Sequence, residues 1–468
     1  MSDFKRSLGL LDATMIVAGS MIGSGIFIVS ASMMRDLGSP AWMLTAWVVS
    51  GLLTVMAALS YGELASMMPA AGGQYKYIQR AFGRLPAFMY GWTVFTVIQT
   101  GVIAAVAVAF AKFSAVFFPV LSPENVLVEA GSMRIDASQL YAIASIVLLT
   151  WFNSRGVDKG KTLQTIVTLA KIGALLALIV VGLSVGMGLP VLAENFSDPW
   201  QASRLVVGAD GSSTSTPLHG MALLAMLGVA MVGSLFASDA WNNITFIAGE
   251  IRKPQRNIPL SLAMGTLIVT VLYVLANIAY LSLLPLHEMQ FAFADRVGTA
   301  AAAVIFGDAA VWIMAALIMV STFGCNNGLI LAGARLYYAM ARDGLFFRKA
   351  GQLNHNSVPG HALVIQCVWA SALCLSGSYG QLLEYTTFAS LLFYVVTIIG
   401  LFVLRVREPA VPRPYKAFGY PVIPGLYVLI ATAFCANLLI MSPVYTGAGL
   451  AIVGLGAVVY LVWVRISA

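Results

Sequence analysis

Charged residues are scarce in this chain of 468 residues. Only 10% of them are Asp, Glu, Lys or Arg, whereas soluble globular proteins carry about 25% charged residues. Hydrophobic residues make up 60% of the chain, and the mean hydropathy is +0.88. This composition excludes an ordinary soluble protein. It predicts an all-α polytopic membrane protein, because a helix satisfies its own backbone hydrogen bonds in lipid.

Cysteine and histidine are also scarce, with four residues of each. All the cysteines (Cys325, Cys367, Cys374 and Cys435) lie within apolar runs rather than in external loops. We therefore expect no structural disulfide and no disulfide-linked partner. The histidines show no metal-ligand spacing, so we expect no metal and no cofactor.

Apolar runs of about 20 residues, the length that a transmembrane helix needs, recur along the whole sequence. They predict twelve transmembrane helices within a single transporter domain over residues 1–468. The runs lie near residues 10–34, 41–66, 86–118, 138–153, 162–187, 219–249, 258–284, 300–340, 361–377, 382–404, 420–441 and 444–464.

The 26 basic residues are unevenly distributed between the two sides of this predicted topology. If the N-terminus is inside, twenty fall on the cytoplasmic side and four (Arg35, Arg134, Arg204 and Arg296) on the other side. Cytoplasmic loops are enriched in Lys and Arg, so we expect both termini in the cytoplasm of a multi-pass plasma-membrane protein, in a bacterial inner membrane. This distribution explains the net charge of +7 without a nucleic-acid partner.

The first apolar run is interrupted in its middle by Gly23-Ser24-Gly25. Glycine in a helix costs about 1 kcal/mol relative to alanine, and backbone that leaves a helix in hydrocarbon must find other hydrogen-bond partners. One interpretation is a binding site built from backbone, where the N–H groups of the resumed helix attract a carboxylate. The alternative is a packing face of small residues, which lets helices approach closely.

The sixth run carries a similar interruption, from Gly233-Ser234 through Ser238-Asp239 to Asn242-Asn243. The two interrupted runs lie five runs apart and have opposite orientations. They indicate two inverted five-helix repeats, at about residues 10–187 and 219–404, with broken helices 1 and 6 meeting at a transport site. The paired interruptions favour transport over simple packing. Helices 11 and 12, at about 420–464, are interpreted as scaffold or as an oligomer surface.

These motifs resemble those of the amino acid–polyamine–organocation transporter superfamily, and most closely its L-type amino acid transporter-like branch. The similarity covers most of the chain and implies the inverted-repeat fold. The matching segments are Gly23-Ser24-Gly25-Ile26-Phe27, Gly72-Gly73-Gln74-Tyr75, Phe236-Ala237-Ser238-Asp239-Ala240-Trp241-Asn242, Glu250…Pro254…Asn257-Ile258-Pro259 and Phe323-Gly324…Asn327-Gly328.

The resemblance implies a substrate site between spans one and six. The amides of Ser24 and Gly25 would hold the amino acid carboxylate, the carbonyls of Met21, Phe236 and Asp239 would take the ammonium group, and the Phe236 ring would be an occluding gate. The remaining residues of the expected substrate site are Gly23, Ile26, Ala237, Ser238 and Asn242. Three positions depart from many relatives, which have an aromatic residue at Ser238, glycine at Ala240 and serine at Cys325.

Lys171 stands near mid-membrane in the fifth run, and an intramembrane charge costs at least about 2.5 kcal/mol on insertion scales. It matches a lysine that, in sodium-independent relatives, occupies the place of a sodium ion. We expect its N–H donors to reach the carbonyls near Ala18 and Gly19 and the hydroxyl of Ser321. The alternative is a lysine that only fills a polar pocket.

The sequence thus predicts a sodium-independent secondary transporter of L-amino acids, an exchanger of small neutral amino acids. The alternatives are proton-coupled symport, or exchange of cationic amino acids or polyamines attracted by Asp239. A membrane enzyme is disfavoured because Asp239 has no second intramembrane aspartate to pair with it. No disulfide-linked heavy-chain partner is expected, and the oligomeric state is left open.

Overall fold

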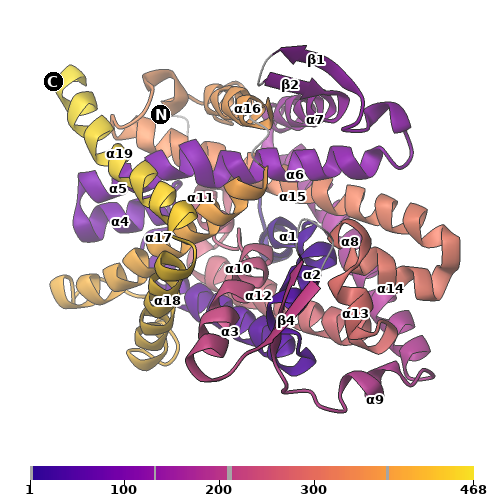
Figure 1. Cartoon of the computed structure of the whole chain (residues 1–468). Coiled ribbons are helices and arrows are strands. Elements are labelled where there is room, and N and C mark those ends of the chain that lie inside the picture. The colour runs from indigo at the N-terminus through magenta and orange to yellow at the C-terminus, as the bar shows by residue number, and fades with distance from the viewer. Residues whose placement is uncertain (1–3, 131–132, 208–212, 376–378, 468) are drawn as a thin grey trace.

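The computed structural model describes residues 4–130, 133–207, 213–375 and 379–467, and these are mostly helical (Figure 1). Two antiparallel hairpins join β1 (Val126–Ala130) to β2 (Met133–Asp136) and β3 (Ser203–Val207) to β4 (Ser213–Pro217). The first helices are α1 (Leu10–Met21), α2 (Gly25–Leu37), α3 (Pro40–Met67), α4 (Gln74–Phe82), α5 (Arg84–Thr93), η1 (Val94–Ile98), α6 (Gln99–Ser114), η2 (Pro119–Leu121), α7 (Ala137–Ser154), α8 (Val157–Gly186) and α9 (Val191–Asn195). The later ones are α10 (Gly220–Ala237), α11 (Asn243–Phe246), η3 (Ala248–Glu250), α12 (Pro254–Leu283), α13 (Leu286–Gln290), η4 (Phe293–Asp295), α14 (Val297–Phe306), η5 (Gly307–Ala309), α15 (Ala310–Arg342), η6 (Arg348–Gly351), α16 (Gly360–Leu375), α17 (Tyr379–Arg407), α18 (Val422–Met441) and α19 (Pro443–Ser467).

The longer helices in this set are those that can cross a membrane. In the described residues, nine helices are long and apolar enough to cross a membrane, and the bent pair α1–α2 makes ten when it counts as one span. α7 and α16 also form from apolar runs but are not among these ten. The chain is therefore a polytopic helical membrane protein.

Both interrupted runs are broken in the structure. The axes of α1 and α2 differ by 41° across the break at Ile22–Ser24. In the sixth run α10 ends at Ala237, and Ala240 has φ of 65°, in the left-handed region that costs about 1–2 kcal/mol for a residue with a side chain. The run predicted to continue to residue 249 is instead completed by the short elements α11 and η3.

The broken helices lie in the middle of the molecule. Figure 1 shows α1 and α2 surrounded by α8, α10 and α12, while α18 and α19 lie at one edge. α1 is buried from Ala13 to its last residue, Met21, and the outer helices expose large apolar side chains such as Leu429 and Leu461. Apolar side chains on the outside and polar backbone breaks inside are the arrangement that a lipid environment requires.

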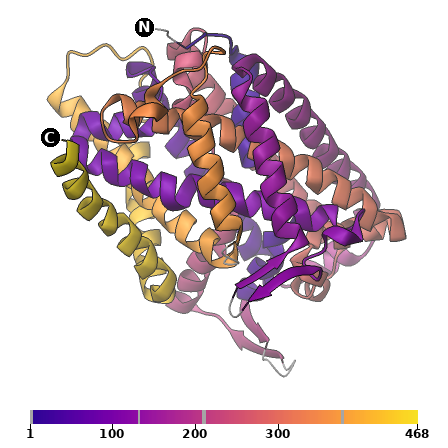
Figure 2. The same cartoon turned by 90° about the horizontal axis from the view of Figure 1, so that it is seen from above.

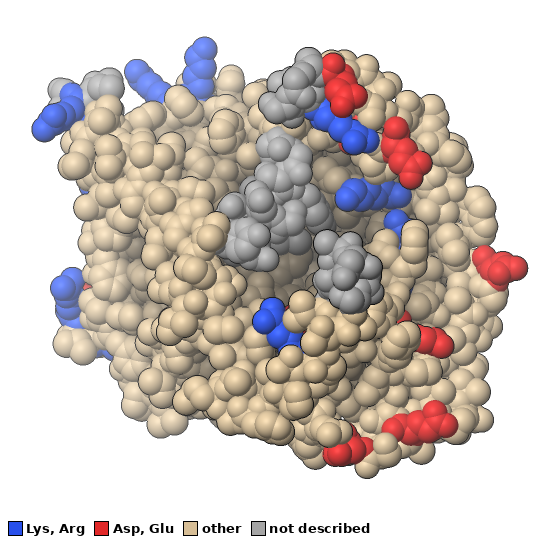
Figure 3. All heavy atoms as spheres, in the orientation of Figure 1, with Lys and Arg blue, Asp and Glu red and all other residues tan. Residues whose placement is uncertain are grey.

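The two ends of the molecule differ in structure. Figure 2 shows the N-terminus at the end opposite to the two hairpins, and we call these ends the N-terminal side and the hairpin side. In the orientation of Figure 1, charged side chains lie mainly around the edge of the visible face and uncharged residues cover most of it (Figure 3).

Buried ion pairs join the helices at the N-terminal side. Glu63 on α3 accepts hydrogen bonds from Arg405 (2.6 Å) and Arg413 (3.1 Å). Arg335 on α15 pairs with Glu250 in η3 at 2.9 Å, and both side chains are at most 2% exposed. The extended residue Leu8 adds backbone hydrogen bonds to the segment at Glu250–Arg252. These contacts hold this end of the helix bundle together.

Candidate functional site

The two helix breaks lie against each other. A Cβ atom on Gly25 would stand 2.8 Å from the Cβ of Ala237, so glycine permits the start of α2 to meet the end of α10. The Tyr273 hydroxyl on α12 lies 3.1 Å from the carbonyl oxygens of both Met21 and Ala237. A tyrosine hydroxyl has one proton, so it donates to one of these carbonyls at a time. Tyr273 thus links the two breaks.

Opposite helix ends meet at this point. The first N–H groups of α2, which begins after Ser24, have no acceptor within their own helix, as at any helix start. The end of α10 contributes carbonyls, and that of Phe236 accepts the Asp239 N–H at 3.1 Å. A helix start carries partial positive charge and a helix end partial negative charge. The pair is complementary to the carboxylate and ammonium groups of an amino acid.

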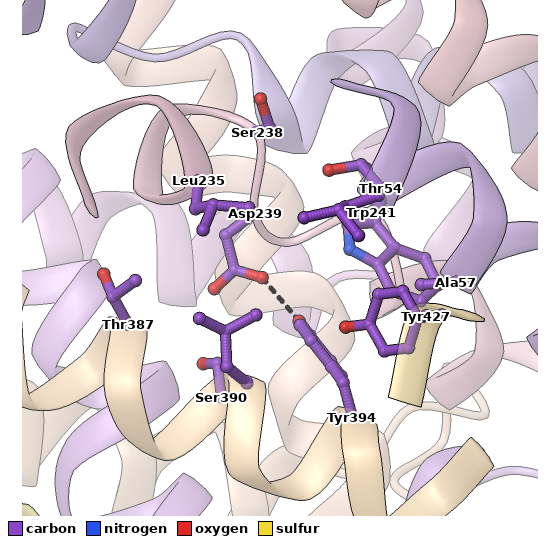
Figure 4. A pocket seen from close by; sticks show the side chains of 12 residues that line it. Thr54, Ala57, Leu235, Ser238, Asp239, Trp241, Thr387, Ser390, Tyr394 and Tyr427 are labelled. Atoms are coloured by element: carbon purple, nitrogen blue, oxygen red, sulfur yellow. Dashed lines mark hydrogen bonds between the residues drawn. The ribbon is translucent and has the colours of Figure 1, made fainter. Parts of the chain in front are cut away.

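Residues 238–242, between α10 and α11, form an unwound segment, and the Asp239 side chain extends from it toward α17. Its carboxylate accepts a hydrogen bond from the Tyr394 hydroxyl at 2.5 Å, and Figure 4 shows it directed toward Ser390 and Tyr394. Both residues come from α17. The pocket drawn in Figure 4 is lined by Leu53, Thr54, Ala57, Leu235, Ser238, Asp239, Trp241, Thr387, Ser390, Leu391, Tyr394 and Tyr427.

A second pocket shares Asp239, Ser390 and Tyr394 with the first and is also lined by residues of α4, α5 and α6. It includes Asn242, whose amide donates to Gln74 Oε1 at 2.8 Å. The same oxygen accepts from the Tyr90 hydroxyl at 2.9 Å, and Gln74 donates to Thr397 at 3.0 Å. These bonds connect the unwound segment to α4, α5 and α17.

The glycine-rich loop before α4 forms part of this support. The Gly72 N–H donates to the Phe246 carbonyl at 3.0 Å, and Gly72 and Gly73 have φ of 100° and 40°. A Cβ on Gly73 would collide with Thr245, so only glycine allows the loop to pack against α11. The loop is a packing element that positions Gln74.

Lys171 on α8 is buried, with 1% of its surface exposed. Its ammonium group donates to the carbonyl oxygens of Gly19 (2.5 Å) and Ile22 (2.6 Å) and lies 3.3 Å from that of Ser321. The Ser321 hydroxyl lies 3.1 Å from the carbonyl oxygens of both Ile22 and Gly23, and its single proton is donated to one of them at a time. The lysine therefore occupies a cluster of carbonyls between the broken helix and α15. Such a cluster is the environment in which a cation is stable.

The predicted contacts of Lys171 differ from this geometry at two points. The Ala18 carbonyl remains in the helix, where it accepts the Ile22 N–H at 3.0 Å, and the lysine donates instead to the carbonyls of Gly19, Ile22 and Ser321. Ser321 contacts the lysine through its carbonyl, and its hydroxyl is directed to the freed carbonyls of the break. The carbonyl of Gly19 is in contact with the ammonium group, and so is that of Ile22, which was not named among the contacts expected from the sequence.

The expected substrate residues lie around the two breaks with different degrees of burial. Met21, Gly23, Ser24, Gly25, Ile26, Ala237, Ser238 and Asn242 are buried. Phe236 and Asp239 are partly exposed. Tyr273, Tyr394 and Gln74 contact these residues but were missed. Each of these tyrosine and glutamine side chains lies in or beside an apolar run. The sequence alone does not distinguish a tyrosine or glutamine that contacts the site from one that only packs between helices.

Metal binding has no candidate in the described part of the chain, which contains no group of three or more His, Cys, Asp or Glu side chains placed to hold an ion. The carbonyl cluster near the first break is occupied by the Lys171 ammonium group.

Comparison with known proteins gives a consistent match across the chain. Residues 8–464 match the family model described as amino acid permease. The b(0,+)-type amino acid transporter 1 of Mus musculus is 29% identical over 453 residues, which cover 95% of this chain and 83% of that protein. The large neutral amino acids transporter small subunit 2 of Mus musculus is 31% identical over 471 residues, which cover 98% of this chain and 81% of that protein. The chain therefore belongs to the amino acid permease family, within the L-type branch of the amino acid–polyamine–organocation transporter superfamily.

Proposed function

We propose that this protein is a sodium-independent secondary transporter of L-amino acids that works as an exchanger. Its twelve helical apolar segments would each span the membrane, in two inverted five-helix repeats followed by two further helices. The membrane would be a bacterial inner membrane, with both termini in the cytoplasm. The relatives named above are amino acid transporters, which supports the general function.

The position of Lys171 is the observation that carries sodium independence. A transporter of this architecture needs to hold its broken first helix against the eighth span during part of its cycle. The Lys171 ammonium group already joins the carbonyls of Gly19 and Ile22 to that of Ser321 on α15. A covalently attached cation removes the need for a bound sodium ion at this place.

The opposed helix ends support an α-amino acid as the substrate. The carboxylate would bind the free amides of Ser24 and Gly25, and the ammonium group would bind carbonyls at Met21, Phe236 and Asp239. The Phe236 ring would close over the bound molecule. A polyamine has no carboxylate for the α2 end, so the site suits amino acids better.

Small neutral side chains fit the first pocket best, because most of its lining is apolar or hydroxyl-bearing and its one carboxylate, Asp239, is bonded to Tyr394. The second candidate is a cationic amino acid. It is favoured by the same carboxylate, which both pockets share.

Transport by purified protein in liposomes tests the proposal. We expect uptake of a radiolabelled small neutral amino acid when unlabelled amino acid is inside, with the same rate in sodium and choline buffers. Lys171→Ala is expected to lose most of the transport rate, because the freed carbonyls at Gly19 and Ile22 lose their cation. Lys416→Ala, an exposed lysine, is the matched control and is expected to keep the unmodified rate.

Sodium-dependent uptake by the unmodified protein, or an unchanged rate in Lys171→Ala, would contradict the proposal. If a proton gradient drives uptake into liposomes that contain no amino acid, the mechanism is proton symport rather than exchange. If lysine or arginine is transported and Asp239→Asn abolishes only that transport, the cationic alternative is correct.

The four cysteines bear on assembly with a heavy chain. Cys325, Cys374 and Cys435 are buried and Cys367 on α16 is partly exposed. We propose that no disulfide links this protein to a partner. Non-reducing electrophoresis of protein taken from its native membrane tests this, since a linked partner would give a larger, reducible band.

A further inference from the structure

A cavity of about 650 Å³ lies at the N-terminal side, away from the helix breaks. α7 begins after the β1–β2 hairpin, and its last turn meets the segment before α16, where Asn354 donates to the Ser154 carbonyl at 3.0 Å. At the other end of this helix pair, Gln139 donates to the Cys374 carbonyl at 3.1 Å. The two helices are therefore antiparallel neighbours (Figure 1), and the cavity lies at the end remote from the hairpin.

The cavity has a basic part and an apolar part. Among the described residues its lining consists of Ser154, Phe347, Arg348, Lys349, Asn354, Gly360, His361, Val364 and Ile365, and none of these is a carboxylate. Arg348, Lys349 and His361 are exposed, and none of them forms an ion pair within the residues that the structure describes. Arg348 and Lys349, which have no ion-pair partner in the described part of the chain, lie beside an apolar wall, and this arrangement is complementary to an anion that carries a hydrocarbon chain.

The helices that border the cavity face lipid. Val364 and Val368 on α16 are 57% and 64% exposed, and Trp151 on α7 is 51% exposed. The Arg155 guanidinium lies 4.1 Å from the centre of the Trp151 ring. Tryptophan and arginine together at a helix end mark the boundary between hydrocarbon and lipid headgroups. The apolar part of the cavity is thus continuous with the membrane, and its basic part lies at headgroup level.

We propose that this cavity binds an anionic phospholipid of the leaflet on the N-terminal side. Arg348 and Lys349 contact the headgroup phosphate, and an acyl chain lies along Phe347, Val364 and Ile365. The cavity volume is within the usual range for small-ligand sites, about 300–1,000 Å³, so it accommodates a headgroup and the start of a chain. This inference does not depend on the substrate or coupling mode proposed above.

Lipid titration of the purified protein, read by native mass spectrometry, tests the site. The probes are phosphatidylglycerol and phosphatidylcholine with identical acyl chains. We expect phosphatidylglycerol to bind more tightly, and Arg348→Gln/Lys349→Gln to weaken its binding about 10- to 30-fold, since each basic residue near a membrane surface contributes about 1 kcal/mol. Arg252→Gln/Arg256→Gln, exposed residues outside the cavity, removes the same charge and is expected to change binding less than twofold.

A second variant tests the apolar part without changing charge. Val364→Trp fills the cavity and is expected to weaken phosphatidylglycerol binding, while size-exclusion chromatography confirms that each variant remains folded. Equal affinity for the two lipids, or an equal loss in the control pair, would refute the site. Displacement of the lipid by glycerol phosphate at lipid-like concentrations would also refute it, because the site would then recognise free phosphate rather than a membrane lipid.

Discussion

Gly25 is the residue at which the backbone site can be tested most directly. A Cβ at this position would lie 2.8 Å from the Cβ of Ala237 and 3.2 Å from its Cα, so any side chain separates α2 from α10. We predict that Gly25→Leu abolishes substrate binding, because the amides of α2 and the carbonyls of α10 no longer face one substrate molecule. Binding of radiolabelled amino acid to purified protein measures the effect.

The control for this substitution is Gly173 on α8, where an added Cβ would have no heavy atom within 4 Å. Gly173→Ala is expected to bind substrate as the unmodified protein does, and both variants are expected to elute as monodisperse protein. Unchanged binding in Gly25→Leu would show that the substrate lies elsewhere.

Sequence predicted the residues of the two breaks but not all of their partners. Small and polar residues in the middle of an apolar run predict a break, because hydrocarbon offers such backbone no partners. The positions of Lys171 and Asp239 followed from the rarity of charge in that setting. Tyr273 and Tyr394 could not be selected in this way, because tyrosine is common in these runs and only the packing of α12 and α17 brings their hydroxyls to the breaks.

Among the secondary-structure elements, η3 and α15 are joined at the N-terminal side by the buried ion pair of Glu250 and Arg335. Glu250→Gln leaves the buried Arg335 guanidinium without its carboxylate, and breaking a buried pair costs about 3–5 kcal/mol. We predict a lower thermal unfolding midpoint, measured in detergent with a thiol-reactive dye or by light scattering. The double variant Glu250→Gln/Arg335→Gln is expected to lose less stability than the sum of the single variants, because it leaves no buried charge.

The surface pair of Arg80 and Glu408 provides the comparison, since both side chains are about a third exposed (35% and 30%). Exposed ion pairs contribute about 0–1 kcal/mol, so Glu408→Gln is expected to change the midpoint little. An equal effect of the two substitutions would show that burial of the Glu250–Arg335 pair does not matter.

Helices were easier to predict than their limits. The twelve apolar runs all contain helix, because only regular hydrogen bonding is stable in lipid. The apolar run near 300–340 is continuous and so predicted one helix. In the structure α14 ends before Gly307, which has φ of 56°, and α15 is a separate helix. The two hairpins were also missed. Their strands are short and lie in connections, where neither length nor hydropathy distinguishes a strand from a loop.

At the scale of the whole molecule, the predicted distribution of basic residues and the positions of the N-terminus and the hairpins distinguish the same two sides. The hairpins lie opposite to the N-terminus (Figure 2), and they contain Arg134 and Arg204, two of the four basic residues that were predicted to lie outside. Twenty of the 26 basic residues were assigned to the side of the N-terminus. Because retention of Lys and Arg in the cytoplasm sets the orientation of membrane proteins, the hairpin side is expected to face outward.

Introduced cysteines can test this orientation in intact cells. Glu129 in β1 and Lys416 after α17 are both exposed, and they lie on the hairpin side and the N-terminal side respectively. We predict that Glu129→Cys reacts with a membrane-impermeant maleimide added outside, and that Lys416→Cys reacts only after the cells are permeabilised. The unmodified protein measures the background from its own cysteines, three of which are buried. The reverse labelling pattern would show that the side rich in Lys and Arg faces outward. The distribution of basic residues would then not determine the orientation of this chain in the membrane.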